Sequence, residues 1–327
     1  MSYIEVKNIQ KQFKVAKRKS GVKATLKNFI KREYKYIDAI KDISFEVDKG
    51  EIVGYIGPNG AGKSTTIKIL SGILIPDNGV CKINNMVPWL SREKYVSRIG
   101  VVFGQRSQLW WDIPAVDTFD LLRDIYKLDN DEYQKTKEEL VHLLNIQGII
   151  EVPVRQLSLG QRMRCEIAAS LLHKPEILFL DEPTIGLDAV SKKIVRDFIK
   201  RINREQNVTV ILTTHDMNDI ESLAKRIILI GKGEILYDGS LKKLKSRYDT
   251  YKYVKIYTKD KIARLKKKGI ISQVKQDDCY QFTIDTIDLD VSSFLNYISS
   301  KINILDIDIE HENIDDIIVK LYEEYQI

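Results

Sequence analysis

Residues 57–65 read Gly-Pro-Asn-Gly-Ala-Gly-Lys-Ser-Thr, and this stretch decides the fold of the chain. It begins with the pattern Gly-x-x-x-x-Gly-Lys-Ser/Thr. Residues 51–56 before it are apolar and β-branched enough for a buried strand, and residues 65–72 after it start like a helix. In a strand, loop and helix of this order, successive backbone N–H groups and the positive end of the helix surround a phosphate. We therefore predict that Lys63 reaches the β- and γ-phosphates and that the Ser64 hydroxyl binds Mg²⁺.

Two carboxylates follow a second apolar run. Residues 177–180 read Ile-Leu-Phe-Leu and precede Asp181 and Glu182. A carboxylate at the end of a strand beside a phosphate loop can hold Mg²⁺, which is the role we predict for Asp181. Side chains alternate along a strand, so Glu182 is expected to point elsewhere and to be the general base for the water that attacks the γ-phosphate. The loop alone fits kinases, GTPases and many ATPases, and this second motif narrows the class.

Further motifs follow in a fixed order. Residues 157–161 read Leu-Ser-Leu-Gly-Gln, residues 186–188 read Gly-Leu-Asp, and residues 213–216 read Thr-Thr-His-Asp. With these motifs in order, the chain resembles the ATP-binding cassette (ABC) family over roughly residues 1–240. The Leu-Ser-Leu-Gly-Gln motif is similar to the family signature, usually Leu-Ser-Gly-Gly-Gln. The Gly-Leu-Asp motif resembles the loop that crosses the dimer interface, and Thr-Thr-His-Asp resembles the segment of the switch histidine, here His215.

Two more assignments rest on this resemblance. The segment Phe-Gly-Gln that ends at Gln105 is similar to the loop that links the two lobes in the family, and its glutamine would sense Mg²⁺ and the attacking water. Gln105 lies one residue later than the simplest spacing gives, and Gln108 is its rival. Tyr34 lies at about the family's spacing for the aromatic residue that stacks on adenine, and Phe13 and Tyr36 are the alternatives.

The resemblance implies that two copies close head to tail around two ATP molecules, because one chain carries one phosphate loop and one signature. Ser158 and the backbone N–H of Gly160 in one copy would meet the γ-phosphate held by Lys63 of the other, and a helix N-terminus suits an anion. Leu159 departs from the usual glycine, but the contacts of its neighbours are expected to persist.

The resemblance also implies a set of site residues. The nucleotide-binding residues are Tyr34, Gly57, Asn59, Gly60, Ala61, Gly62, Lys63, Ser64, Thr65, Ser158, Gly160, Gln161 and Asp188. The catalytic residues are Glu182, His215, which would contact the γ-phosphate of its own chain, and Gln105. The Mg²⁺ ligands are Ser64, Gln105 and Asp181. The implied cofactors are therefore ATP and Mg²⁺.

The 327 residues, 43% hydrophobic and 30% charged, are enough for one large domain and a small one. No stretch approaches the roughly 18 apolar residues that a membrane span needs, and the first five residues do not read as a signal peptide. The scattered cysteines Cys81, Cys165 and Cys279 show no metal spacing and read as reduced thiols. We expect a peripheral protein at the cytoplasmic face of the cell membrane.

Residues 14–36 form a basic insertion. They hold nine Lys or Arg against Glu33 alone, nine positive charges less one negative, and this net charge of +8 exceeds the net charge of +6 of the whole chain. The apolar residues at helical spacing are Val22, Leu26, Phe29 and Ile30. They predict a short basic amphipathic helix. One interpretation is contact with anionic lipid or an acidic partner. The alternative is a solvated insertion whose apolar residues pack on the domain.

We predict an α/β fold in which a P-loop NTPase core carries an ABC-type helical subdomain. The nucleotide-binding domain spans residues 1–239, with the helical subdomain at about 106–172. Trp110 and Trp111 follow the glutamine loop, and in the family this region forms the groove that receives a helix of the membrane subunit. One tryptophan is predicted to line that groove. The alternative is that both are core residues of the helical lobe.

Residues 240–327 are predicted to form a small C-terminal accessory domain of the α+β class. The expected elements are strands over 251–258 and 305–310, a hairpin over 271–286, and helices over 260–268, 291–298 and 314–322. This order suggests a ferredoxin-like split β-α-β unit with one added helix. Residues 242–268 hold twelve Lys or Arg, whereas 276–327 hold thirteen Asp or Glu. We interpret the domain as regulatory or dimer-stabilising, and the alternative is a structural cap.

The leading hypothesis is an ATP-hydrolysing subunit that powers a separate integral-membrane permease. Residues 103–111 resemble one branch of ABC exporter subunits, for drugs, sodium, antimicrobial peptides or polysaccharides, and export rests on this analogy. The alternative is a soluble ABC ATPase acting on the ribosome or nucleic acid, which the basic insertion would suit. A single cassette without sustained heptads disfavours it. A nucleotide kinase would leave the signature unexplained. The expected partners are a second copy or a homologous ATPase subunit and the permease, not nucleic acid.

Overall fold

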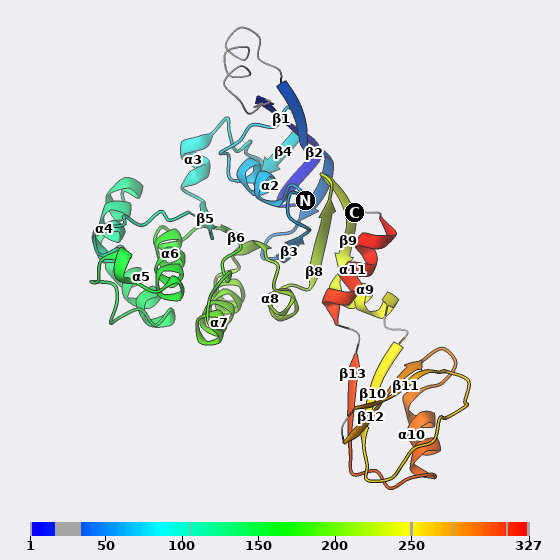
Figure 1. Ribbon diagram of the computed structural model, residues 1–327. Coiled ribbons are helices and arrows are strands. Elements are labelled where there is room, and N and C mark those ends of the chain that lie inside the picture. Colours follow the sequence, from blue (N-terminus) through cyan, green and yellow to red (C-terminus); the bar gives the residue numbers. More distant parts are fainter. Residues whose placement is uncertain are drawn as a thin grey trace, which may run out of the picture. The chain divides into compact units, whose positions relative to one another are not determined.

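The computed structural model describes six stretches of the chain: residues 2–16, 34–104, 106–248, 251–276, 278–311 and 313–325. Gln105 lies outside them, as does the basic amphipathic helix predicted around residues 22–30. The chain divides into two compact units, Met1–Gly239 and Ser240–Ile327 (Figure 1). None of the described helices is long and apolar enough to cross a membrane.

A nine-stranded sheet forms the centre of the first unit, in the order β4-β1-β2-β9-β8-β3-β7-β6-β5 (Figure 1). Its strands are β1 (Ile4–Ala16), β2 (Tyr34–Val47), β3 (Ile52–Ile56), β4 (Asn78–Ile83), β5 (Ile99–Phe103), β6 (Ile177–Asp181), β7 (Thr209–Thr213), β8 (Arg226–Gly231) and β9 (Glu234–Ser240). Strands β8, β3, β7, β6 and β5 pair in parallel, whereas β1 pairs antiparallel with β2 and β4. The carboxyl ends of parallel strands meet at one edge of a sheet, where ligands bind.

Helices cover the parallel strands of this sheet. They are α2 (Lys63–Leu70), α3 (Arg92–Val96), α4 (Ala115–Tyr126), α5 (Asn130–Leu143), α6 (Leu159–Leu171), α7 (Ala189–Gln206) and α8 (Met217–Leu223). Residues 177–180 and all of β7 are buried, which is the pattern of strands covered on both faces. Helices α4, α5 and α6 gather in a helical lobe beside β5 (Figure 1). The predicted α/β fold is therefore confirmed.

One hydrophobic cluster joins the sheet to α2 and thereby holds the loop before this helix. Ile67 and Ile69 of α2 are buried in the cluster together with Val53 and Tyr55 of β3. Burial of an aliphatic side chain of this size stabilises the fold by about 1.5–3 kcal/mol. The Tyr55 hydroxyl also lies 3.2 Å from Oγ1 of Thr66, in the first turn of α2.

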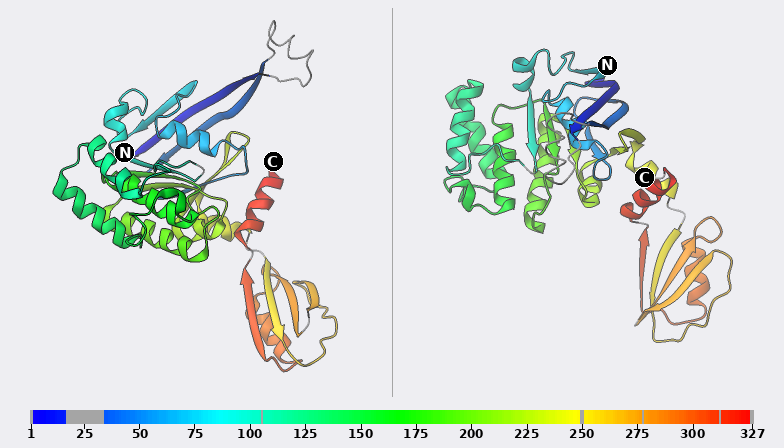
Figure 2. Two further views of the ribbon diagram at one scale, coloured as in Figure 1. Left: turned by 60° about the vertical axis from the view of Figure 1, so that its left-hand side comes forward. Right: turned by 45° about the horizontal axis from the view of Figure 1, so that its top comes forward.

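Strands β1 and β2 continue past the sheet as an antiparallel ribbon (Figure 2). Near the end of the ribbon Phe13 pairs with Ile37 and Lys14 pairs with Tyr36. Directly opposed residues share a face, and successive residues alternate between faces. Phe13 and Ile37 therefore lie on one face of the ribbon, whereas Tyr34 and Tyr36 lie on the other.

The second unit contains a four-stranded antiparallel sheet in the order β11-β12-β10-β13. Its elements are α9 (Leu241–Tyr248), β10 (Tyr251–Tyr257), β11 (Ile270–Gln276), β12 (Cys279–Asp285), α10 (Val291–Ser299), β13 (Asp306–His311) and α11 (Ile314–Glu324). Phe294 and Ile298 of α10 pack with Val254 and Phe282 of the sheet. Strand β10 lies between β12 and β13, which α10 connects, as in a split β-α-β unit, so the small C-terminal α+β fold is confirmed.

The helix predicted over residues 260–268 is wrong, since residues 261–267 have no regular secondary structure. Ile262 and Leu265 pack on the core of the unit, which explains the helical spacing in the sequence. Their backbone N–H groups, however, donate to the Tyr280 hydroxyl at 3.2 Å and to Gln273 Oε1 at 2.9 Å. Side chains of β11 and β12 thus supply the hydrogen bonds that a helix would have made within itself.

Candidate active site

The phosphate loop turns between β3 and α2 with two glycines in the left-handed region. Gly60 has a φ of +81° and Gly62 a φ of +112°, which other residues rarely adopt. A Cβ atom on Gly62 would also lie 2.5 Å from the carbonyl oxygen of Ala39. No side chain caps α2, which begins at Lys63. The first N–H groups of the helix therefore suit a phosphate.

Lys63 is buried within the loop, where its ammonium group donates to two carbonyl oxygens. The distances are 2.7 Å to Gly57 O and 3.1 Å to Pro58 O. Burial lowers the pKa of Lys63, while the charges of Glu182 and Asp181 act in the opposite direction. A buried cation favours an anionic ligand, because the opposite charge compensates for lost hydration.

Asp181 and Glu182 lie at the carboxyl end of β6. Asp181 Oδ1 accepts a hydrogen bond from Thr213 Oγ1 at 2.6 Å, since parallel pairing places Thr213 beside it. Glu182 has a φ of +57°, which is strained for a residue with a side chain. Glu182 Oε1 lies 2.8 Å from His215 Nε2, which in turn lies 3.4 Å from Lys63 Nζ. Alternation does not separate the two carboxylates, because the strand ends at Asp181 and both line one cavity.

This cavity, of 510 Å³, opens over the phosphate loop. Asn59, Ser64 and Asp181 line it beside the loop, and Phe13 and Ile37 line it at the β1–β2 ribbon. The volume suits a nucleotide, since ligand pockets typically measure about 300–1,000 Å³. The Ser64 hydroxyl and the Asp181 carboxylate are hard oxygen donors of the kind that Mg²⁺ prefers. The cavity therefore fits ATP with its metal ion.

Of the three aromatic candidates on the ribbon, Phe13 lines this cavity and the tyrosines do not, so the choice of Tyr34 gives way to Phe13; Phe103 lines the cavity from the end of β5. Tyr34 does not line the cavity, because it lies on the opposite face of the ribbon together with Tyr36. Lys14 Nζ instead lies 4.1 Å from the centroid of the Tyr34 ring, within the range of a cation–π contact. Spacing along the chain pointed to Tyr34, whereas the register of β1 against β2 determines which aromatic side chain reaches the cavity.

The signature residues form the start of α6. Ser158 Oγ accepts a hydrogen bond from Gln161 N at 3.2 Å, and Gln161 Oε1 accepts one from Ser158 N at 2.8 Å, which is a capping box. The Gln161 side chain thus caps its own helix, and its predicted nucleotide contact gains no support. Gly160 packs against α7, since a Cβ atom there would lie 2.4 Å from Ser191 Oγ. None of these residues lines the cavity that contains Lys63.

Asp188 and Gln108 make structural contacts. Asp188 caps α7 by accepting from Ser191 N at 2.9 Å and from Ser191 Oγ at 2.8 Å, and these hydrogen bonds lower the pKa of Asp188. Gln108 Nε2 donates to the carbonyl oxygen of Glu166 at 3.0 Å, and Gln108 does not line the cavity. The rival of Gln105 is therefore engaged with α6, while Gln105 itself lies beyond the described residues.

Trp110 and Trp111 are both exposed, with relative exposures of 58% and 53%. The alternative that both are core residues is therefore wrong. The Arg162 guanidinium lies 5.7 Å from the Trp111 ring centroid. A separate groove of 1000 Å³ between α3 and the end of α4 is lined by Leu90 and Ile125 and by neither tryptophan.

The sequence alone did not identify Thr213 and Arg106 as residues of the site. Thr213 ends β7 as Asp181 ends β6, and the shared carboxyl edge of two parallel strands could have indicated their contact. Arg106 lines the cavity from the segment after β5. Nothing in its sequence context distinguishes it from other arginines of the chain.

Comparisons with known proteins agree with this geometry. A sequence model of the family described as ABC transporter matches residues 40–185. The ABC transporter ATP-binding protein NatA of Bacillus subtilis (strain 168) is 33% identical over 210 residues, which are 64% of this chain and 85% of that protein. The linearmycin resistance ATP-binding protein LnrL of the same organism is 35% identical over 218 residues, 67% of this chain and 70% of that protein.

A solved structure supports the same classification. It is a dimer of an ATP-binding cassette in a post-hydrolysis state, bound to ADP and Pi. It matches with a TM-score of 0.61 and 27% identity, over 73% of this chain and 98% of that one. The present chain therefore belongs to the family of ABC transporter ATP-binding proteins. The prediction that it is an ATPase is confirmed.

Proposed function

We propose that this chain hydrolyses ATP at composite sites formed by two copies, or by one copy and a homologous subunit, arranged head to tail. The supporting observation is that the phosphate loop and the signature of one chain do not line the same cavity. Lys63 and Glu182 line one cavity, whereas Ser158 and Gly160 begin a helix that does not line it. A second chain can bring its signature to the γ-phosphate, and a helix N-terminus suits that anion. The dimeric state of the solved relative agrees with this arrangement.

Residues of the cavity, and His215 next to Lys63 and Glu182, have distinct proposed roles. Glu182 accepts the proton of the attacking water, since its carboxylate faces the cavity and is held by His215 at 2.8 Å. Lys63 and His215 stabilise negative charge that develops at the γ-phosphate. When bound by Ser64 and Asp181, Mg²⁺ supplies positive charge to the β- and γ-phosphates.

Two further assignments complete the proposed nucleotide site. Phe13 provides the surface on which adenine stacks, because it is the aromatic residue that lines the cavity at the ribbon. Gln105 keeps its proposed role as the sensor of Mg²⁺ and the attacking water, on the family resemblance alone.

We also propose that an integral-membrane permease docks in the groove between α3 and α4. Leu90 and Ile125 line this groove and have relative exposures of 77% and 60%. Arg92 and Lys127 add charge to its walls. A groove of mixed apolar and charged character suits an amphipathic helix of a partner. Such docking would hold the chain at the cytoplasmic face of the cell membrane.

Export is the proposed direction of transport, because residues 103–111 resemble exporter subunits. The name of LnrL refers to linearmycin resistance, but other relatives are named for methionine import. Transport assays in inverted membrane vesicles, once the permease is known, test the direction. ATP-dependent accumulation of cargo inside inverted vesicles supports export, and accumulation only in right-side-out vesicles contradicts it.

The C-terminal accessory domain, residues 240–327, is proposed to stabilise or regulate the dimer. The basic residues of 242–268 and the acidic residues of 276–327 are of opposite sign, so two copies offer each other complementary charge. Removal of this unit tests the proposal through ATP-dependent dimerisation. A truncated chain that dimerises and hydrolyses ATP as the full chain does would leave only the role of a structural cap.

Copurification from native cells tests the transporter assignment. The tagged chain is isolated from gently solubilised membranes with ATP present, and we expect one or two polytopic membrane proteins to copurify. Recovery should fall when Leu90→Asp is combined with Ile125→Asp, but not with Ile287→Asp, which alters an exposed residue of the second unit. Recovery of ribosomes or nucleic acid without membrane protein would favour the alternative, a soluble ABC ATPase.

A further inference from the structure

The first turns of α7 touch two separate parts of the proposed mechanism. At its start Ser191 lies against the signature, since a Cβ atom on Gly160 would meet Ser191 Oγ at 2.4 Å. One residue later, Lys192 Nζ lies 2.5 Å from Oδ2 of Asp216. Asp216 directly follows His215 in the chain. A short stretch of helix therefore joins the signature of a chain to its own switch histidine.

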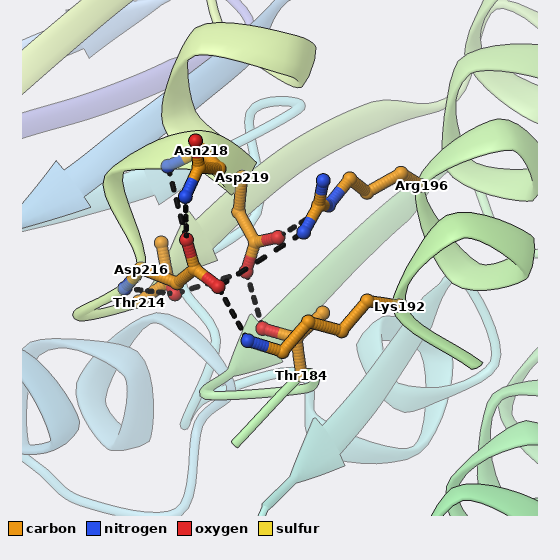
Figure 3. A network of polar contacts seen from close by, with 7 residues as sticks. All are labelled: Thr184, Lys192, Arg196, Thr214, Asp216, Asn218 and Asp219. Atoms are coloured by element: carbon orange, nitrogen blue, oxygen red, sulfur yellow. Dashed lines mark hydrogen bonds and ion pairs between the residues drawn. The ribbon is translucent and has the colours of Figure 1, made fainter. Parts of the chain in front are cut away.

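A second ion pair lies one turn further along α7, and Figure 3 shows Arg196 beside Asp219, which in turn contacts Thr214. Arg196 Nε donates to Asp219 Oδ1 at 2.6 Å, and Asp219 is completely buried. Oδ2 of Asp219 accepts hydrogen bonds from Thr214 at 3.1 Å and from Thr184. Thr214 directly precedes the switch histidine, and Thr184 lies two residues after the candidate base. The network thus ties both catalytic segments to one helix.

We propose that Lys192 and Arg196 are positioning residues that couple the signature of a chain to the hydrolytic residues of the same chain. This inference rests on the proposed head-to-tail dimer. In that dimer the signature contacts the nucleotide held by the partner, whereas Glu182 and His215 act on the nucleotide of their own chain. Through α7, occupancy of one site sets the position of His215 at the other, which makes hydrolysis cooperative.

Arg196 Nη2 also lies 3.9 Å from Asp216 Oδ2, but replacing Lys192 and replacing Arg196 would affect the fold differently. Arg196 neutralises a buried carboxylate, and removing one partner of such a pair is strongly destabilising. Lys192 and Asp216 are both partly exposed. Asp216 also caps α8 by accepting from Asn218 N at 3.0 Å, and this contact does not depend on Lys192. Lys192 is therefore the residue whose replacement separates positioning from folding.

The test compares Lys192→Gln with Lys193→Gln, because Lys193 is the exposed neighbour on the same helix. Hydrolysis is measured against ATP concentration, where the wild-type chain should give a Hill coefficient above 1. In Lys192→Gln we expect a kcat lower on the order of tenfold, as small misplacements near a reacting group cause. We also expect its Hill coefficient to fall towards 1. Lys192→Arg should restore both values, and Lys193→Gln should match the wild type.

Two further measurements separate this role from a structural one. In the Glu182→Gln background, Lys192→Gln should keep its ATP-dependent dimerisation and its ATP affinity, because no group that contacts the nucleotide is altered. Its melting temperature should stay within a few degrees of that of Lys193→Gln. Unchanged kcat and Hill coefficient would overturn the proposal. The proposal would also be overturned if Lys192→Gln lost ATP affinity and thermal stability together with kcat, because that pattern marks a structural role.

The outcome for the wild-type chain distinguishes this inference from the proposed function. A wild-type chain that neither hydrolyses ATP nor dimerises with it, alone or together with a homologous ATPase subunit that copurifies with it, would overturn the head-to-tail dimer, and the coupling with it. Normal wild-type behaviour together with an unaltered Lys192→Gln variant would overturn the coupling alone.

Discussion

Glu182 Oε1 lies 2.8 Å from His215 Nε2, although the two residues follow different strands and are far apart in the chain. The contact exists because β6 and β7 are parallel neighbours whose carboxyl ends meet at one edge of the sheet. His215 Nε2 is also 3.4 Å from Lys63 Nζ. The candidate base, the switch histidine and the phosphate-loop lysine thus gather within one chain, whereas the signature does not line the cavity of Lys63 and Glu182.

Glu182→Gln is expected to lower the rate of ATP hydrolysis by about 10²–10⁴-fold, the contribution of a general base. ATP binding should persist, because Lys63 and the phosphate loop are unchanged. Steady-state phosphate release measures the rate, and size-exclusion chromatography with ATP should show a trapped dimer. Hydrolysis at the wild-type rate would remove Glu182 as the base.

Phe13→Ala is expected to weaken ATP binding by about 1–3 kcal/mol, the usual contribution of stacking a base on an aromatic ring. Tyr34→Ala is the matched control and should bind ATP as the wild type does, because Tyr34 faces away from the cavity. Titration with a fluorescent ATP analogue measures both affinities. The opposite pattern would return the stacking role to Tyr34.

Ser158→Arg is expected to abolish hydrolysis while each chain still binds ATP. A long cationic side chain at the start of α6 would keep the signature from the partner's γ-phosphate. Mixing it with Lys63→Ala creates dimers with one intact composite site, so the mixture should recover part of the activity. Normal hydrolysis by Ser158→Arg alone would contradict the head-to-tail arrangement.

Gly160→Ala is expected to lower the free energy of unfolding by about 1–3 kcal/mol, the cost of an added methyl group in a tight contact. The new Cβ atom would lie 2.4 Å from Ser191 Oγ and 2.9 Å from Ser191 Cβ. Leu159→Ala should cost less, since Leu159 is partly exposed. Urea denaturation measures both variants. Equal stability of Gly160→Ala and the wild type would show that α6 and α7 separate without cost.

The buried carboxyl group of Glu166 is expected to make the free energy of unfolding depend on pH. Burial raises the pKa of this carboxyl, against hydrogen bonds from Ser107 Oγ and from Gln108 N at 3.2 Å. The folded state then holds the proton more tightly than the unfolded state, so the contribution of Glu166 to stability falls as pH rises from the ordinary value towards the raised one. Glu166→Gln should remove this part of the dependence in urea midpoints measured across that range. Parallel pH profiles for the two proteins would contradict it.

Local sequence determined the phosphate loop and the class of fold. Gly60 and Gly62 are required by the backbone conformation of the loop itself, and Lys63 and Ser64 follow them directly. The apolar run before Asp181 is that of a strand covered on both faces, which parallel pairing requires. These features depend on neighbours in the chain, so motif and spacing suffice to predict them.

Only the tertiary structure decided which distant side chains meet. The choice of Phe13 over Tyr34 depends on the register of β1 against β2, and a shift of β2 by one residue would turn Tyr34 to the face of Phe13. Ile262 and Leu265 have helical spacing, yet they pack on the core from an irregular segment. This is possible because side chains of β11 and β12 accept hydrogen bonds from the backbone of that segment. The pairing of Arg196 with Asp219 joins two helices, and no local pattern encodes such a contact. Spacing along a chain specifies which residues can share a face, whereas packing between elements determines what that face contacts.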